Sequence, residues 1–121
     1  MKVKTSELQG AALDWAVAQC EGVETKKYKD SPSLFFGIGF DKWRPSTDWA
    51  QGGPIIELHK IEITAWGKDQ WRARSNWNEG YKDWVHVTMF EVYGPTPLIA
   101  AMRCYVASKL GNEVEVPEEL V

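Results

Sequence analysis

Residues 94–111 read GPTPLIAAMRCYVASKLG, and this stretch carries the clearest helix signals in the chain. Thr96 is a favoured N-cap residue, and Pro97 suits the first helical position because it has no N–H group to leave unpaired. Gly111 is a natural stop for the helix, and Lys109 complements the negative end of its dipole. The predicted buried stripe of this helix consists of Leu98, Ala101, Met102, Tyr105, Val106 and Leu110.

Three segments before this helix alternate apolar and polar residues, which is the pattern of half-buried strands. Residues 67–69 and 78–80 join them and are rich in the Gly, Asn and Asp of tight turns. Such short joins predict an antiparallel meander, with Arg72, Arg74 and Asn76 on its wetter face. The three predicted strands are residues 61–65, 71–77 and 85–90.

Another helix is predicted near the N-terminus, over residues 6–21. Ser6 and Gln9 have the spacing of a capping box, and Gly22 follows as a natural C-terminal cap. Trp15 falls on the apolar face of this helix, so we expect it to pack into the core.

A third helix is predicted over residues 47–59, with Ser46 or Thr47 as its N-cap and Asp48 in its first turn. Pro54 lies inside this range and has no N–H group to donate to the preceding turn. We therefore expect a single helix that is kinked at this position.

The remaining segments carry weaker signals. Residues 34–40 are apolar but contain two glycines, which is compatible with a weakened strand or with an extended loop. Val3, between two lysines, suits a short strand, and residues 114–121 suit another short strand followed by a turn. The fold of residues 23–45 stays open at this level.

These elements together predict an α+β fold. The sheet is expected to be antiparallel, with three to four strands, and to pack with two to three helices in an α-β-α sandwich-like arrangement. The length of 121 residues fits a single domain, and a hydrophobic content of 44% is ordinary for a globular protein.

Charge and composition narrow the function classes. The net charge is −3, and no run of Lys and Arg forms a basic stripe, so we expect no nucleic acid polymer as a partner. No stretch is long enough to span a membrane, and the first residues lack the apolar core of a signal peptide. The expectation is therefore a cytoplasmic protein that does not bind membranes.

Signs of catalysis and of cofactor binding are sparse. Cys20 and Cys104 have no partner at metal-ligand spacing, so we expect reduced thiols, no metal and no cofactor. The two histidines, His59 and His86, belong to no nucleophile or metal motif. A non-catalytic protein is the favoured interpretation.

The seven tryptophans are many for this length, and two of them fall in residues 41–49 with an arginine and a predicted helix start. Free N–H groups at a helix start and a guanidinium both bind anions, and an indole stacks on a base. The alternative is purely structural, with caps for the helix and tryptophans at the edge of the core. The candidate ligand-binding residues are Trp43, Arg44, Ser46, Thr47, Asp48, Trp49, Arg72, Arg74, Trp77 and Thr96.

Several strings resemble the NinX-like proteins of lambdoid phages. The resemblance covers nearly the whole chain and is weakest over residues 62–92. It implies a phage or prophage accessory protein made inside a bacterial host cell, and it implies no mechanism. The strings are MKVKTSEL (1–8), ALDWAVA (12–18), PSTDWAQGGPIIE (45–57), GPTPLIAAMRCYV (94–106) and VEVP (114–117).

Two function hypotheses from different classes follow. The first is a non-catalytic binder of a small anionic ligand, such as a nucleotide signal, with a role in host takeover or in blocking host defence. The second is an adaptor that docks on a host protein through exposed tryptophans. A small hydrolase ranks below both, and a homodimer is compatible with an exposed strand edge.

Overall fold

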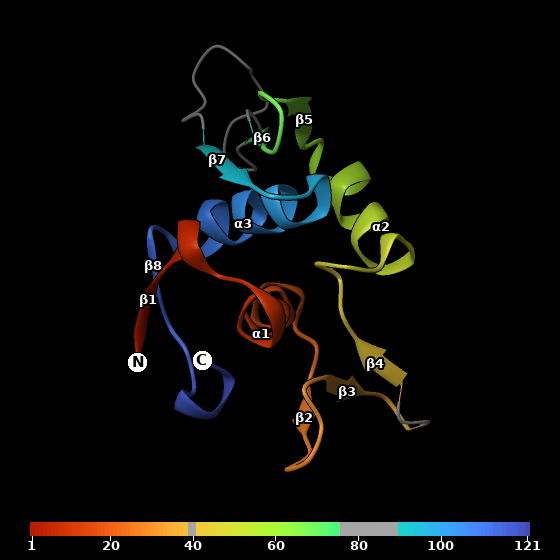
Figure 1. Ribbon diagram of the computed structural model, residues 1–121. Helices are drawn as coiled ribbons and strands as arrows, with labels where there is room; N and C mark the ends of the chain where they lie inside the picture. The colour runs from red at the N-terminus through yellow and green to blue at the C-terminus, as the bar shows by residue number, and fades with distance from the viewer. Residues whose placement is uncertain (39–40, 76–89) are drawn as a thin grey trace.

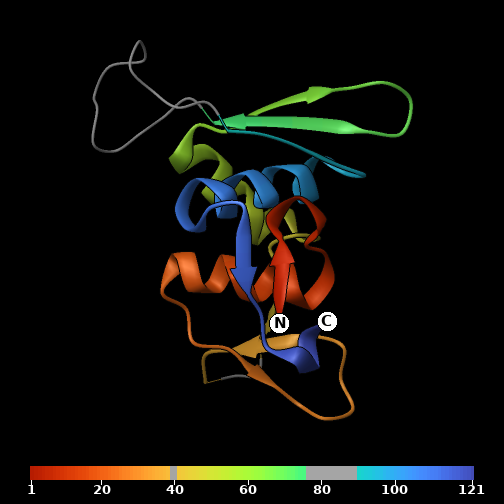
Figure 2. The same cartoon turned by 90° about the vertical axis from the view of Figure 1, so that its left-hand side faces the viewer.

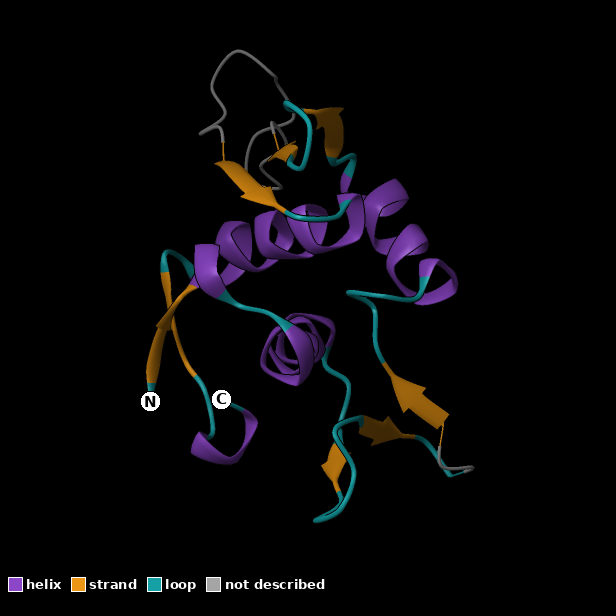
Figure 3. Cartoon of the chain, in the orientation of Figure 1, coloured by secondary structure: helices purple, strands orange, loops and turns teal. Residues whose placement is uncertain are grey.

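The computed structural model describes residues 1–38, 41–75 and 90–121. In this part of the chain three α-helices lie together in the middle of the molecule, and strands lie on either side of them (Figures 1 and 3). The helices are α1 (Gly10–Glu21), α2 (Trp49–His59) and α3 (Pro97–Leu110).

The strands form three small antiparallel sheets. One sheet packs on α3 and a second lies beyond α1, while the third pairs strands from the two ends of the chain (Figure 2). The first sheet contains β5 (Glu62–Ala65), β6 (Trp71–Ser75) and β7 (Phe90–Gly94). The second contains β2 (Lys26–Lys27), β3 (Leu34–Phe36) and β4 (Asp41–Trp43). The third pairs β1 (Lys2–Lys4) with β8 (Glu113–Glu115), and two short 3₁₀ turns lie at Thr5–Glu7 and Glu118–Leu120.

The α+β class with antiparallel sheets is confirmed, but the order of the layers differs from a sandwich with helices outside. The helices lie between the sheets, and α3 is accordingly buried on more than one side. Ala100, Cys104 and Ala107 are buried in addition to the predicted stripe, so the β5–β6–β7 sheet and α1 can both pack against this helix.

The predicted caps of α3 are confirmed, and one predicted core residue is wrong. The Thr96 side chain accepts a hydrogen bond from the Ile99 N–H group, Pro97 opens the helix, and Gly111 ends it. Leu110 is 42% exposed, and Lys109 next to it is exposed as well, so the buried part of α3 ends before its last two residues.

The N-terminal helix begins later than predicted. Ser6 lies in the 3₁₀ turn, and α1 starts at Gly10 with Gln9 as an N-cap that makes no side-chain hydrogen bond, so the capping box is wrong. This turn begins at Thr5, which is buried and donates its hydroxyl hydrogen to the Gly111 carbonyl. Gly22 ends α1 in the left-handed conformation, as predicted.

The helix around Pro54 is one continuous element, as predicted, but its N-cap is Asp48 rather than Ser46 or Thr47. The Asp48 carboxylate accepts from the Ala50 N–H group at 2.9 Å. Ser46 cannot serve as this cap because it is buried against α1, where its N–H group donates to Asp14.

The first two strands of the predicted meander are confirmed in β5 and β6. The third was predicted over residues 85–90, and β7 begins at Phe90 and continues to Gly94. Residues 76–77 and 85–89, and the predicted turn at 78–80, lie outside the described residues. In the part of the chain that the structure describes, no helix is long and apolar enough to cross a membrane.

Candidate functional site

The segment around residue 43 is held against α1 by hydrogen bonds to Asp14. Trp43 is buried, and its indole N–H donates to the Asp14 carbonyl at 2.8 Å. The Ser46 N–H group donates to the Asp14 carboxylate at 2.9 Å, and Phe36 packs edge-on against the Trp43 ring. Trp43 and Ser46 therefore hold a loop on the core rather than facing solvent.

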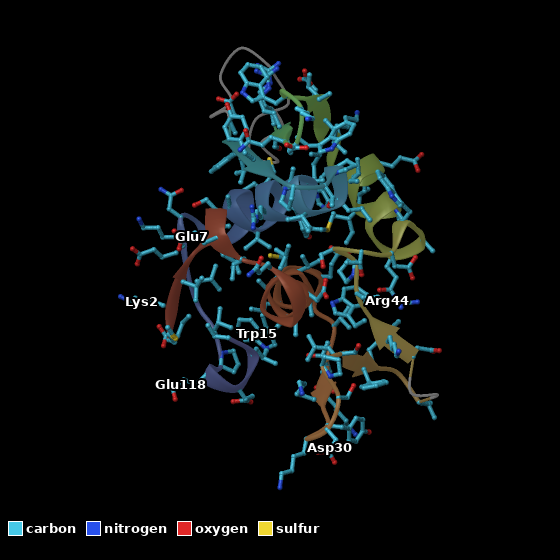
Figure 4. All side chains as sticks on the ribbon, in the orientation of Figure 1. Lys2, Glu7, Trp15, Asp30, Arg44 and Glu118 are labelled. Atoms are coloured by element: carbon cyan, nitrogen blue, oxygen red, sulfur yellow. The ribbon has the colours of Figure 1, made fainter. Side chains whose placement is uncertain are left out.

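Four other predicted site residues surround the start of α2. The Asp48 carboxylate fills the N-terminal end of the helix as its cap, and the Arg44 guanidinium lies 3.8 Å from it. Thr47 and Trp49 are exposed beside them. Figure 4 shows Arg44 next to this end of α2. An anionic ligand at this helix start would meet a carboxylate already in place.

The predicted arginine row does lie on one face of the β5–β6–β7 sheet, and each arginine has an acidic neighbour across the strands. The Arg72 guanidinium lies 3.5 Å from Glu91, and the Arg74 guanidinium lies 2.9 Å from Glu62. The positive charge of the row is thus largely neutralised.

The nine predicted residues that the structure describes are therefore not gathered around one cavity. Neither of the two larger clefts formed by the described residues is lined by residues 43–49. Thr96 caps α3 and is exposed. Trp77 lies outside the described residues.

A cleft of about 680 Å³ lies where the turn between β5 and β6 meets the end of β7 and the outer side of α3. Its volume is in the range of small-molecule sites. We call it the Trp66 cleft, and its lining is Ser6, Trp66, Gly67, Lys68, Asp69, Gln70, Glu91, Val92, Tyr93, Gly94, Pro95 and Arg103.

Aromatic rings form one wall of the Trp66 cleft. Trp66 is 45% exposed, and its ring centroid lies 6.0 Å from that of Tyr93. Arg72, from the predicted site, stacks on the Trp66 ring with its guanidinium carbon 4.3 Å from the centroid. The contact holds the indole in place while leaving much of it exposed to a ligand.

Arg103 supplies a fixed cation to the same cleft. Its Nε–H group donates to the Leu8 carbonyl at 2.7 Å, and an Nη1–H group donates to the Tyr93 carbonyl at 2.9 Å. A guanidinium has five N–H groups, so three are left without a protein acceptor among the described residues. Burial lowers the pKa of Arg103, and nearby Glu7 opposes that shift.

Charged side chains of both signs line the Trp66 cleft. Glu91 accepts from the Tyr93 hydroxyl at 3.3 Å and pairs with Arg72, so its carboxylate is already occupied. Lys68 and Asp69 are exposed at the turn. Arg103 forms no ion pair with a described residue, although Glu7 lies near enough to affect its pKa, so its guanidinium is the cation available to an anion.

Local sequence patterns pointed to none of the three main residues of this cleft. Trp66 follows a strand, Tyr93 lies within one, and Arg103 lies within a helix. The one available signal is the alternation in β6, which places Arg72 on the same face as its cross-strand partner Tyr93.

The two thiols show little sign of reactivity, and the described residues form no metal-ligand cluster. Burial raises the pKa of the Cys20 thiol to about 11 and that of the Cys104 thiol to about 12, so both stay protonated at neutral pH. Among residues 1–38, 41–75 and 90–121, no three His, Cys, Asp or Glu side chains are grouped as metal ligands would be.

Comparison with known families places the chain in a phage family. The family model described as Bacteriophage P22, NinX matches residues 4–109. No curated protein matches the chain.

Proposed function

The chain belongs to the phage family described as Bacteriophage P22, NinX. We propose that it binds a small anionic ligand with a planar ring, such as a nucleotide, without catalysing a reaction. The proposed site is the Trp66 cleft. A phage accessory protein of this kind would act in the host cytoplasm, where holding a nucleotide signal away from its receptor would serve host takeover or block defence.

The observation that carries the proposal is Arg103, a guanidinium fixed by two carbonyl groups beside an aromatic wall. A planar ring gains from stacking on Trp66, and a phosphate or carboxylate gains from charge-assisted hydrogen bonds to the guanidinium. Because Arg103 is already held in position, little side-chain entropy is lost when a ligand binds.

The proposal is tested by a thermal-shift and calorimetric screen of nucleoside mono-, di- and cyclic phosphates. We expect at least one of them to bind saturably and to raise the melting temperature. Trp66→Ala should weaken that binding about tenfold or more, since stacking on one ring is of this strength. Trp49→Ala is the matched control, because Trp49 is exposed on α2 and lines no part of the cleft.

The adaptor hypothesis makes the opposite prediction. If every nucleotide leaves the melting temperature unchanged while a host protein is recovered with the chain in a fixed ratio, the ligand proposal fails. Trp49→Ala would then be the informative variant, because its exposed indole is suited to a protein interface.

A further inference from the structure

The β2–β3–β4 sheet turns one face to the core and the other away from it. Cross-strand partners share a face, so Leu34 and Trp43 lie together on the inner side, where both are buried. Alternation along β3 then places Phe35 on the outer side. Phe35 pairs with Lys26 on one neighbouring strand and with Lys42 on the other.

The outer side therefore presents an aromatic ring between two lysines. Tyr28 adds a second ring, which packs edge-on against Phe35 with the centroids 5.3 Å apart. Tyr28 is 43% exposed, and both lysines are exposed. We call this surface the Phe35 face and define it by Lys26, Tyr28, Phe35 and Lys42.

Among the described residues, neither Lys26 nor Lys42 forms an ion pair. Asp41 is the acidic residue within these strands, and it pairs with Phe36 on the opposite side of the sheet. Although the net charge of the chain is −3, the Phe35 face itself carries two lysines and no carboxylate.

The backbone beneath this face is held in place, and there is room beside it. The Gln51 amide donates to the Lys42 carbonyl at 2.7 Å and accepts from the N–H group of Arg44, which closes the outer edge of β4. A cleft of about 990 Å³ opens on the Lys26 side of this face, where Lys26, Tyr28 and Phe35 line it together with Glu24 and others.

We propose that the Phe35 face binds single-stranded nucleic acid. Unpaired bases stack on exposed aromatic rings, and lysines on each side attract the phosphates of the same strand. A duplex fits the surface less well because its bases are not available for stacking. The proposal is independent of the Trp66 cleft and departs from the expectation of no nucleic acid partner, since Lys26 and Lys42 come together only through strand pairing.

The test is fluorescence anisotropy of a labelled oligothymidine of about 12 nucleotides at low salt. With two lysine contacts, log K should fall with log salt concentration with a slope of about −1.4, which is −0.7 for each phosphate contact times 2. Phe35→Leu should weaken binding about tenfold or more while keeping an apolar side chain in place.

Two double variants distinguish a local site from general attraction. Lys26→Gln with Lys42→Gln should abolish the salt dependence and most of the binding, and both positions are exposed, so folding should be unaffected. Lys2→Gln with Lys4→Gln changes the net charge equally at exposed positions on β1 and should leave binding unchanged. Trp66→Ala should also leave it unchanged, which separates this surface from the nucleotide site.

Three results would overturn the proposal. One is the absence of saturable binding by the wild-type protein at about 50 mM salt. Another is equal weakening by the two double variants. The third is equal affinity for a duplex of the same length or for an oligoglutamate peptide, of which the latter would indicate an acidic protein partner.

Discussion

The guanidinium of Arg72 stacks on the ring of Trp66, with its central carbon 4.3 Å from the ring centroid. The two residues lie on either side of the turn that joins β5 to β6, and Arg72 also pairs with Glu91 on β7. The Arg72 side chain of β6 thus contacts both β7 and the turn residue Trp66, which forms a wall of the proposed ligand site. We therefore expect stability and ligand binding to be coupled at this point.

Removing the indole should therefore weaken ligand binding and should also have a small effect on folding. Trp66→Leu is expected to lower the free energy of unfolding by about 0.5–1 kcal/mol through the lost cation–π contact. Urea denaturation measures this, with Trp49→Leu as a control expected within about 0.5 kcal/mol of wild type. A loss of several kcal/mol would mean that Trp66 belongs to the core and is not a ligand surface.

The buried carboxyl group of Asp14 should make stability depend on pH. Burial raises its pKa from 3.8 to about 6, while hydrogen bonding from Ser46 acts in the opposite direction. Between these two values the folded state binds more protons than the unfolded state, so stability falls as the pH rises from about 4 to about 6. The shift of about two units corresponds to about 3 kcal/mol.

Asp14→Asn tests this assignment, because the amide keeps an oxygen that can accept from the Ser46 N–H group. The variant should lose the decline in stability between pH 4 and pH 6 that the wild-type protein shows in urea titrations at several pH values. An identical pH profile in both proteins would show that another group is responsible.

Gly94 should tolerate no side chain. A Cβ atom at this position would lie 2.7 Å from the Ala100 backbone nitrogen, where neither backbone segment can move without displacing β7 or α3. Gly94→Ala should therefore destabilise the protein by about 1–3 kcal/mol, as overpacking does. Thermal denaturation gives the result.

Gly53→Ala is the matched control for that variant. Nothing lies within 4 Å of a Cβ atom at Gly53, which is inside α2. Alanine is favoured over glycine within helices by about 0.5–1 kcal/mol, so this substitution should raise the melting temperature. If both glycine variants behaved alike, the close packing of Gly94 on α3 would be refuted.

The cap of α3 can be checked in the same way. Thr96→Ala should cost about 1 kcal/mol, because the hydroxyl accepts from the Ile99 N–H group. Thr47→Ala is the control, since Thr47 is exposed and is not the cap of α2. Equal melting temperatures for the Thr96 variant and the wild-type protein would show that the cap contributes nothing.

Local signals predicted most of the secondary structure, because the features that decide it lie within a few residues of each other. Thr96, Pro97 and Gly111 mark both ends of α3 and are correct. The layer order was not predictable in this way. Small residues such as Ala100 and Ala107 do not indicate that a helix is covered on more than one side.

The candidate sites depended on contacts that no local pattern contains. Trp43, the last residue of β4, is buried in the core, while Arg44, which follows the strand, is exposed, so two neighbours in sequence have separate roles. Trp66, Tyr93 and Arg103 come from three elements that meet only after the sheet has packed on α3. Predicting which side chains meet would have required the strand register, and the sequence alone did not determine that register.

The most direct test of the ligand-binding account is calorimetric titration of the wild-type protein and of Arg103→Lys with the nucleotide that gives the largest thermal shift. Lysine keeps the charge but loses the planar fork, so we expect saturable binding by the wild-type protein and a loss of about tenfold or more in the variant. If no nucleotide gives saturable heat with the wild-type protein, or if Arg103→Lys binds as tightly, the Trp66 cleft is not the anion site described here.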